Sequence, residues 1–302
     1  VAVSDTYGGV LVLAMGLLVV VLSLMAINFD FSGIPAERLT LIGDSASPVP
    51  WHTLLTGMFL IQILYWSTNQ TITRRAMAAP TVKAAQKGVY AAAFIRVVFI
   101  PSMVVIPGIV AFKLYGDIGD QAYGRIVGDL LPGWLSGIFA AAIAAAVLSS
   151  FNSMVNSSAA MYVCDLHEAY ISDKPNLRAL SGGATVIFVI IAVCMVPIYA
   201  QSDSIINLLQ ELWGLISMPI LACFAVGLLF RNVDYRAAIT AVIAGVLMYA
   251  CFIWIWMPLH YIHMMFFTFF ACVAIALFVN RFILGNRAVF IGLETEELPQ
   301  TT

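Results

Sequence analysis

The stretch Ala140–Ser158 reads A-A-A-I-A-A-A-V-L-S-S-F-N-S-M-V-N-S-S and decides the fold class of this chain. It begins as an apolar run of alanines and then fills with hydroxyls and amides, without a single charge. Polar groups left unsatisfied in hydrocarbon are costly. Polar side chains in a membrane helix therefore usually face a bundle interior or a water-filled path, where they indicate a functional site. The stretch predicts a membrane helix that lines such a path.

Three residues of this stretch share one face of the predicted helix. Ala146, Ser149 and Ser150 stand at positions i, i+3 and i+4. They offer one backbone carbonyl and two hydroxyls, which are all neutral oxygen atoms. Oxygen is the ligand that small hard cations prefer. We therefore expect this face to suit an ion such as sodium.

The composition defines the class of protein. The chain has 302 residues, of which 62% are hydrophobic and 10% are charged, whereas about 25% of a soluble domain is charged. Several apolar runs approach the roughly 20 residues that span a bilayer. We predict an all-α, polytopic membrane protein with no nucleic-acid partner. The five scattered cysteines form no C-x-x-C pair and are expected to be small hydrophobic residues in helices.

Hydropathy predicts about eight transmembrane segments, and a short surface helix at Asp120–Leu131 that is stopped by Pro132 and Gly133. The eight segments are Ser4–Ile27, Thr53–Met77, Gly88–Lys113, Trp134–Cys164, Leu180–Ala200, Ile205–Phe230, Tyr235–Met257 and Tyr261–Leu284.

Basic residues set the expected orientation. Three of them, Arg38, Lys113 and Arg125, lie on one side of the predicted segments. The larger set lies on the other side, which the positive-inside rule makes cytoplasmic: Arg74, Arg75, Lys83, Lys87, Lys174, Arg178, Arg231, Arg236, Arg281 and Arg287. We expect a multi-pass protein of the cell membrane, with a transmembrane domain over residues 1–293 and a cytoplasmic C-terminal tail over residues 294–302. Because the chain starts at Val1 and enters an apolar segment at once, we expect it to be the C-terminal part of a longer protein.

The second segment carries polar residues at depth. Gln62, Tyr65 and Asn69 recur on one face, and the run Ser67–Gln70 is more polar than one face can hide. Broken helices of this kind mark the binding sites of transporters, so an unwound stretch is expected here. The alternative is a helix end at which Tyr65 and Trp66 form an interfacial aromatic belt.

Four further residues are candidates for function. Arg96 lies within the third segment, where it either extends back to the cytoplasmic interface or meets a polar partner. Gln210 could contact a solute, whereas Glu211 beside it is interpreted as a capping or interfacial carboxylate. Asp5 is either a partner of the helix dipole or a group that attracts a departing cation.

Enzymatic and metal motifs are missing from the sequence. It contains no Walker A sequence, no G-x-S-x-G and no H-E-x-x-H, so we do not expect an enzyme. His260 and His263 lack further ligands at suitable spacing, and they are interpreted as part of an outer-surface loop.

Taken together, three motifs resemble the sodium/solute symporter family, and its sodium/glucose cotransporter branch most closely. The first is Ala2-Val3-Ser4-Asp5-Thr6. The second is Tyr65-Trp66-Ser67-Thr68-Asn69-Gln70 with Arg74-Arg75-Ala76 and Ala85-Gln86-Lys87-Gly88. The third is Ala146-Val147-Leu148-Ser149-Ser150 with Asn156-Ser157-Ser158-Ala159 and Asp165-Leu166.

The resemblance implies a fold. The family has the five-plus-five inverted repeat of the LeuT type. On that template the chain holds core helix five, the second repeat and two further helices, and it lacks the first four core helices. Ala146, Ser149 and Ser150 then correspond to the sodium ligands on core helix eight. They form half of that site, so we expect the isolated chain not to be a competent symporter.

The resemblance also implies a solute site. Tyr65 corresponds to the inner-gate tyrosine, Trp66 to the aromatic residue after it, and Gln210 to a glutamine that contacts sugar hydroxyls. Gln62 and Arg96 stand where a bacterial relative has asparagine and lysine, and Asn69 belongs to the second motif. Asp5 matches an acid on the sodium exit path, although the glutamine expected three residues later is Gly8 here.

The expected function is sodium-coupled symport of a small polar solute, a sugar, by alternating access. Na⁺ is the coupling ion, and the solute and the lipid bilayer are the other partners. One alternative is a sodium symporter of a carboxylate or a sialic-acid-like anion, with Arg96 as the counter-charge. Another is a transporter-like sensor or channel without sodium coupling.

Overall fold

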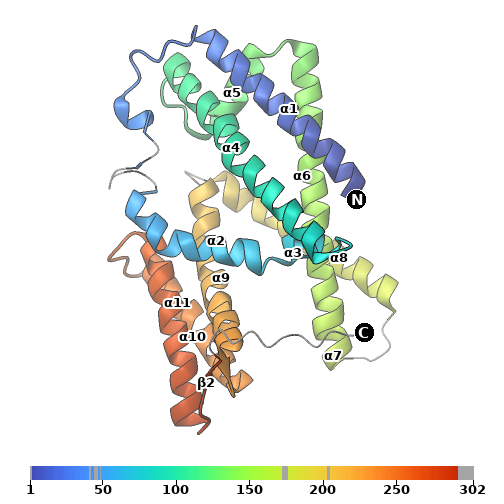
Figure 1. Ribbon diagram of the computed structural model, residues 1–302, viewed down its shortest axis with the longest axis vertical. Coiled ribbons are helices and arrows are strands. Elements are labelled where there is room, and N and C mark those ends of the chain that lie inside the picture. Colours follow the sequence, from blue (N-terminus) through green and yellow to red (C-terminus); the bar gives the residue numbers. More distant parts are fainter. Residues whose placement is uncertain are drawn as a thin grey trace. The chain divides into compact units, whose positions relative to one another are not determined.

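The computed structural model describes residues 2–40, 42–43, 47, 49–171, 176–202 and 205–291, with side chains from residue 6 onward. Helices make up nearly all of it, and two short strands pair antiparallel (Figure 1). The elements are α1 (Ala2–Ala26), η1 (Ala36–Arg38), η2 (Trp51–Leu55), α2 (Gly57–Ser67), α3 (Gln70–Met77), α4 (Val82–Tyr115), η3 (Gly119–Gln121), α5 (Ala122–Leu130), α6 (Gly133–Met161), η4 (Tyr162–His167), α7 (Glu168–Tyr170), α8 (Leu177–Ala200), α9 (Ile205–Leu229), β1 (Phe230–Arg231), α10 (Tyr235–Trp254), α11 (Tyr261–Phe278), η5 (Val279–Ile283) and β2 (Val289–Phe290).

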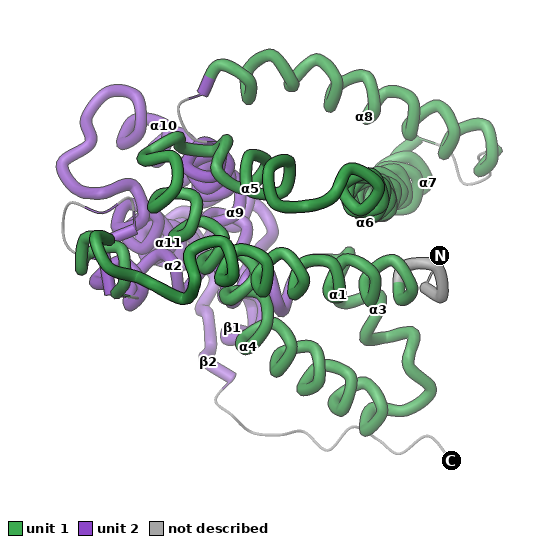
Figure 2. The backbone as a smooth tube through the Cα atoms, turned by 90° about the horizontal axis from the view of Figure 1, so that it is seen from above, with its two compact units in different colours: residues 1–41, 70–201 green, residues 42–69, 202–302 purple. Residues whose placement is uncertain are grey.

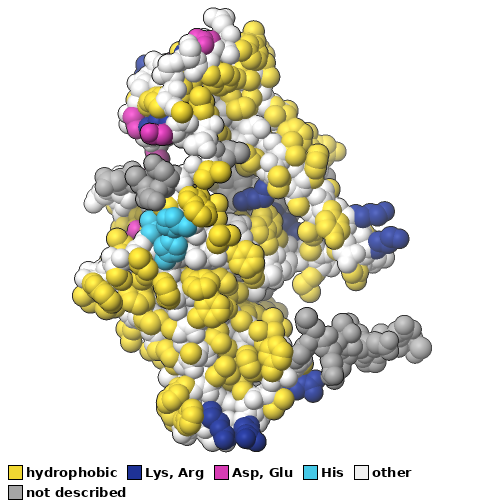
Figure 3. Space-filling model, turned by 60° about the vertical axis from the view of Figure 1, so that its left-hand side comes forward, with side chains coloured by type: hydrophobic (Ala, Val, Ile, Leu, Met, Phe, Trp, Pro, Cys, Tyr) yellow, Lys and Arg dark blue, Asp and Glu magenta, His cyan; other side chains and the backbone are white. Residues whose placement is uncertain are grey.

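Seven of the described helical segments are long and apolar enough to cross a membrane, at 20 to 38 residues each. Only 6% to 39% of their most apolar windows is buried inside the protein. Their remaining apolar side chains point outward, and hydrophobic side chains cover much of the face seen in Figure 3. This arrangement suits lipid rather than water. The expectation of an all-α polytopic membrane protein is confirmed.

The second expected segment, Thr53–Met77, is not one continuous helix. It consists of η2, the 11-residue helix α2 and the 8-residue helix α3. At 1.5 Å per residue α2 covers only about 16 Å, whereas the hydrocarbon core of a bilayer is about 30 Å thick. Seven unbroken helices among the described residues are thus long enough to span a membrane, and the remaining expected segment is a broken helix.

The chain divides into two compact units (Figure 2). Unit 1 comprises residues 1–41 and 70–201. In it α1 packs on α4 and α6, α8 packs on α6, and α5 lies against α1 and α4. The core of this packing contains Val19, Val110 and Ile126, none of which is exposed. Helix α5 confirms the short helix expected near Asp120–Leu131, and it ends just before Pro132.

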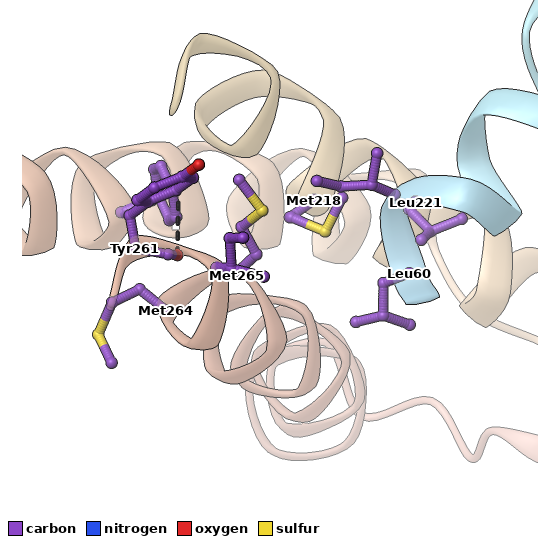
Figure 4. Close-up of a cluster of buried hydrophobic side chains, with 9 residues drawn as sticks. Leu60, Met218, Leu221, Tyr261, Met264 and Met265 are labelled. Carbon is purple, nitrogen blue, oxygen red and sulfur yellow. Dashed lines mark hydrogen bonds between the residues drawn. The ribbon is translucent and has the colours of Figure 1, made fainter. Parts of the chain in front are cut away.

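Unit 2 comprises residues 42–69 and 202–302. Helices α9, α10 and α11 form a three-helix bundle, and α2 lies against α9 and α11. The core of the bundle is rich in methionine and tyrosine (Figure 4). Met218, Tyr249, Ile262 and Met265 are completely buried there. The expected tail at residues 294–302 lies outside the described residues.

Candidate functional site

The second hydropathy segment is broken where its polar run begins. Helix α2 ends at Ser67 and α3 begins at Gln70. The hydroxyls of Ser67 and Thr68 donate to the carbonyls of Ile63 and Leu64 one turn back. Such bonds compete with the hydrogen bonds that continue a helix. The expected unwinding at Ser67–Gln70 is confirmed, and at this break the chain passes from unit 2 to unit 1.

The last turns of α2 carry a polar and aromatic cluster within unit 2. Gln62 accepts a hydrogen bond on Oε1 from Nε1 of Trp66 at 3.0 Å. The ring of Tyr65 packs edge-on to Trp66, with centroids 5.2 Å apart. Tyr65 also stacks on Trp213 of α9, with centroids 5.8 Å apart and an interplanar angle of 29°. The structure thus brings three predicted residues together, and it adds Trp213.

Helix α9 extends this cluster with Gln210. Its side-chain oxygen Oε1 is buried and has no hydrogen-bond partner among the described residues. A buried acceptor without a partner costs about 1–3 kcal/mol, which a bound hydroxyl donor would recover. Trp213 follows Gln210 by three residues, so the two lie on neighbouring parts of one helix face. Sequence reasoning missed Trp213, although its spacing from Gln210 was a usable signal. We call Gln62, Tyr65, Trp66, Gln210 and Trp213 the solute wall.

The face predicted for sodium lies on α6, in unit 1. Ser149 and Ser150 fall near the middle of a helical segment that runs from Gly133 to Tyr170. Ala146 and Ser149 are half-buried, and Ser150 is exposed. All three lie on one continuous helix and present neutral oxygens in the expected register. We call these three residues the sodium face.

An arginine lies one turn away from the sodium face. Ser153 donates a hydrogen bond from its hydroxyl to the Ser149 carbonyl at 3.0 Å. The same hydroxyl accepts one from Arg75 of α3 at 3.3 Å. The sequence placed Arg75 among the cytoplasmic basic residues, and the structure adds this bond to α6. Because α3 and α6 are more than 50 residues apart in sequence, no spacing rule could reveal it.

The remaining predicted residues lie elsewhere. Arg96 is exposed on α4, in unit 1, whereas the solute wall belongs to unit 2. Asn69 is half-buried at the break between α2 and α3. The side chain of Asp5 lies outside the described residues, although its backbone is part of α1. The structure thus places the other predicted residues in two groups, one on α6 in unit 1 and one on α2 and α9 in unit 2.

The basic residues predicted on the outer side are all paired. Arg38 contacts Asp117 at 2.7 Å, Lys113 contacts Asp30 at 3.0 Å, and Arg125 contacts Asp129 at 3.0 Å. Hydrogen bonds from the Ser32 backbone N–H and hydroxyl, and then from Lys113, lower the pKa of Asp30 to about 2. Each of the three cations predicted on the outer side thus has an acidic partner.

The histidines differ from their interpretation as a surface loop. His260 caps the N-terminus of α11, and His263 lies in the first turn of that helix. His263 is hydrogen-bonded to His52 at 2.8 Å and to Thr56 at 2.9 Å. Within the described residues, no group of three or more His, Cys, Asp or Glu could hold a metal ion.

Among the described residues, seven apolar helices of spanning length and a broken helix are typical of a polytopic membrane transporter. The sodium:solute symporter family model matches residues 8–245, and the chain belongs to that family. This confirms the family that the sequence motifs resembled. Because the family is one of symporters, the expectation that the chain is not an enzyme is also confirmed.

Curated relatives include symporters from bacteria and mammals. The chain is 29% identical over 262 residues to an uncharacterized symporter of Escherichia coli, YidK, covering 82% of this chain and 46% of the relative. It is 34% identical over 215 residues to the sodium/glucose cotransporter of Vibrio parahaemolyticus, covering 64% of this chain and 39% of that protein. It is 26% identical to the human sodium/myo-inositol cotransporter 2, covering 67% and 33%. The chain thus spans between a third and a half of the length of these relatives.

A solved structure shares the fold. A Na⁺-coupled sialic acid symporter in a substrate-bound, outward-open state matches with a TM-score of 0.69 at 15% identity, covering 92% of this chain and 61% of that one. This supports the LeuT-type architecture expected from the motifs, and the chain corresponds to only part of it.

Proposed function

We propose that the protein to which this chain belongs is a sodium-coupled symporter of a small polar solute, a sugar, working by alternating access. The observation that carries the proposal is the sodium face on α6, with Ala146, Ser149 and Ser150 in one register within a family of sodium symporters. The carbonyl of Ala146 keeps a second lone pair after its helical hydrogen bond. With two hydroxyls beside it, this face supplies neutral oxygen ligands for a hard cation.

The solute wall supports a neutral, hydroxyl-bearing solute. The buried Oε1 of Gln210 requires a donor, and the amide group of Gln62 offers N–H donors while its oxygen is occupied by Trp66. The ring of Tyr65, stacked on Trp213, provides a flat apolar surface. A neutral sugar needs many directional hydrogen bonds rather than one counter-charge, and amides provide them.

In this mechanism sodium binding favours the state that binds solute, and both ligands are then released together on the other side. Coupling needs only that the two ligands favour the same states. A coupling free energy of about 1–3 kcal/mol corresponds to a roughly 5- to 150-fold change in affinity.

The test measures solute uptake by the native, full-length gene product in proteoliposomes, with choline replacing sodium as the control. We expect uptake of a neutral sugar that depends on the sodium gradient. Ser149→Ala should raise the half-saturating sodium concentration at least about tenfold, because a ligand is lost. Solute binding or flux that ignores the sodium gradient and is unchanged in Ser149→Ala would identify a sensor or channel instead.

A second candidate solute is an anion such as a carboxylate or a sialic-acid-like sugar acid. Arg96 within a membrane helix favours it, and the solved structure with this fold is a sialic acid symporter. Uptake should be compared across matched neutral and acidic solutes in the wild type and in Arg96→Gln. Acid uptake that is lost in the variant while neutral uptake is absent from both would establish the anion as the solute.

We also propose that the protein sits in the cell membrane with its C-terminus in the cytoplasm, as the distribution of Lys and Arg indicates. A reporter fused after Thr302 should be protected from externally added protease in intact cells. Cleavage of that reporter without permeabilisation would reverse the orientation.

A further inference from the structure

Glu211 is a carboxylate inside a membrane span. It lies in the second turn of α9, a candidate span of 25 residues, and is half-buried. The described residues provide it with no hydrogen bond and no ion pair. A capping role is therefore not what the structure shows, because a cap requires a hydrogen bond to the helix end.

Polar side chains share the helix face of this carboxylate. Asn207, Gln210 and Glu211 stand at i, i+3 and i+4 and share one face of α9. The hydroxyl of Tyr261 donates to Oδ1 of Asn207 at 3.4 Å. Gln210 has its buried, unpartnered Oε1 on the same face.

Two tyrosines of neighbouring helices pack on α9 on either side of Glu211. The hydroxyl of Tyr261 on α11 is bonded to Asn207, one turn before Glu211, and Tyr249 on α10 packs on Gly214, three residues after it. Tyr249 is completely buried, and its hydroxyl donates to the carbonyl of Tyr261 at 3.5 Å (Figure 4). It also packs so closely on Gly214 that a side chain there would overlap it. The tyrosine hydroxyls therefore lie within one turn of Glu211 along α9.

Among the described residues no Lys or Arg of unit 2 pairs with Glu211, although the ring of His260 packs on that of Tyr261 at 4.5 Å. Arg236 on α10 lies 13 residues before Tyr249, or about 20 Å along the helix. Among the described residues α11 carries no Lys or Arg, and its His263 is hydrogen-bonded to His52 and Thr56. Helix α2 has only Tyr65 as a titratable group. An unpaired carboxylate within a membrane costs several kcal/mol, so a cation must neutralise it.

We propose that Glu211 anchors a monovalent-cation site that is separate from the sodium face on α6. Asn207 Oδ1 and the hydroxyl of Tyr261 are its neutral oxygen partners. The occupant is a proton or a sodium ion, and each removes the net charge. All of these residues belong to unit 2. The proposal therefore rests on packing within that unit and does not depend on the proposed transport activity.

Infrared difference spectroscopy of the purified protein tests the site directly. Protein labelled with ¹³C-glutamate should be compared across a pH series in choline, and then across a sodium series at fixed pH. If the occupant is a proton, a protonated glutamate carbonyl band grows as the pH falls and ignores sodium. If it is sodium, the carboxylate band shifts with sodium at fixed pH. A glutamate signal that responds to neither cation overturns the proposal.

Variants assign the signal to Glu211. Glu211→Gln should abolish the response, whereas Glu168→Gln, which alters an exposed glutamate on α7, should leave it intact. Glu211→Asp, labelled with ¹³C-aspartate instead, should keep a response whose midpoint moves at least about tenfold in sodium or about one pH unit, because the carboxylate is shortened. Tyr261→Phe should move the midpoint in the same way. If Glu211→Gln is too unstable to purify, the labelled wild type and Glu211→Asp still decide the question, and an unchanged midpoint in Glu211→Asp overturns it.

Uptake separates this proposal from the proposed function. In the native gene product, Glu211→Gln should flatten the dependence of uptake on pH or on sodium while uptake remains measurable. If the protein shows no coupled uptake at all, the proposed function fails, but the infrared response of Glu211 still reports on the cation site. If a folded Glu211→Gln variant shows the same infrared response to pH or sodium as the wild type, the cation site at Glu211 is contradicted, even where uptake is normal.

Discussion

At the scale of single residues, Thr56 determines which nitrogen of His263 carries the proton. The Thr56 hydroxyl donates to the Thr53 carbonyl at 3.1 Å, so Nδ1 of His263 must donate to that hydroxyl at 2.9 Å. Nε2 of His263 then accepts from Nδ1 of His52 at 2.8 Å. The two imidazole rings are nearly parallel, and histidines gather on the face shown in Figure 3. The network joins η2 and the start of α2 to the start of α11.

Thr56→Val should destabilise unit 2 by about 1–3 kcal/mol, because it leaves the Nδ1–H of a partly buried histidine without an acceptor. The melting temperature in detergent should fall by several degrees. Thr240→Val is the matched control, since that hydroxyl is exposed and donates only to the carbonyl one turn back. Equal melting temperatures for the two variants would contradict the network.

Asp30 gives a pH-dependent prediction outside the membrane spans. Its folded pKa is about 2, below the ordinary value of 3.8. The carboxylate of Asp30 therefore binds a proton more readily in the unfolded state. The stabilisation that charged Asp30 gives the folded state is complete above about pH 4 and is lost as the pH falls toward 2. The difference in melting temperature between the wild type and Asp30→Asn should be constant near neutral pH and should shrink by pH 3. A difference that stays the same at pH 3 would show that the charge of Asp30 does not contribute.

At the scale of elements, Gly57 sets how closely α2 approaches α11. A Cβ at this position would overlap the backbone oxygen of Ile262, which cannot rotate away. Gly57→Ala should therefore displace α2, at a cost of about 1–3 kcal/mol, and lower the melting temperature. Gly227→Ala on α9 meets open space and should be neutral or stabilising by up to about 1 kcal/mol. If Gly57→Ala behaves like Gly227→Ala, the close approach is not a feature of the folded protein.

The sequence predicted helices and breaks correctly where the deciding residues lie within a few positions of one another. Hydropathy located every long span, and the polar run at Ser67–Gln70 located the break, because hydroxyls bonding one turn back act within a few residues. Hydropathy treated the second segment as one continuous run, whereas the structure divides it into η2, α2 and α3. The two-residue strands β1 and β2 are too short to carry a periodic pattern.

The contacts within the candidate site depended on tertiary structure. Trp213 stacks on Tyr65 across 148 positions of sequence, and Arg75 reaches Ser153 across 78. The sequence could identify the residue types on each helix face, but it could not identify which faces meet. Glu211 shows the difference most clearly. Its sequence context at the start of a segment favoured a capping or interfacial carboxylate, whereas in the structure Tyr261 and Tyr249 pack on α9 on either side of it.

At the scale of the whole molecule, the sodium face belongs to unit 1 and the solute wall to unit 2. Along the chain the two units are joined at residues 41–42, 69–70 and 201–202. The middle connection is the break between α2 and α3. Under the proposed function, coupling between sodium and solute therefore requires both units.

This division predicts how two variants differ in full-length uptake measurements. Ser149→Ala should raise the apparent KM for the solute when sodium is subsaturating, because less of the protein then has sodium bound and the sodium-bound form binds the solute more tightly. Saturating sodium should return the KM to the wild-type value. The increase is bounded at roughly 5- to 150-fold by a coupling of about 1–3 kcal/mol. Gln210→Ala removes a solute contact, so its KM should stay raised at every sodium concentration. A Ser149→Ala defect that persists at saturating sodium would place Ser149 in solute binding or folding, and would remove it from the sodium face.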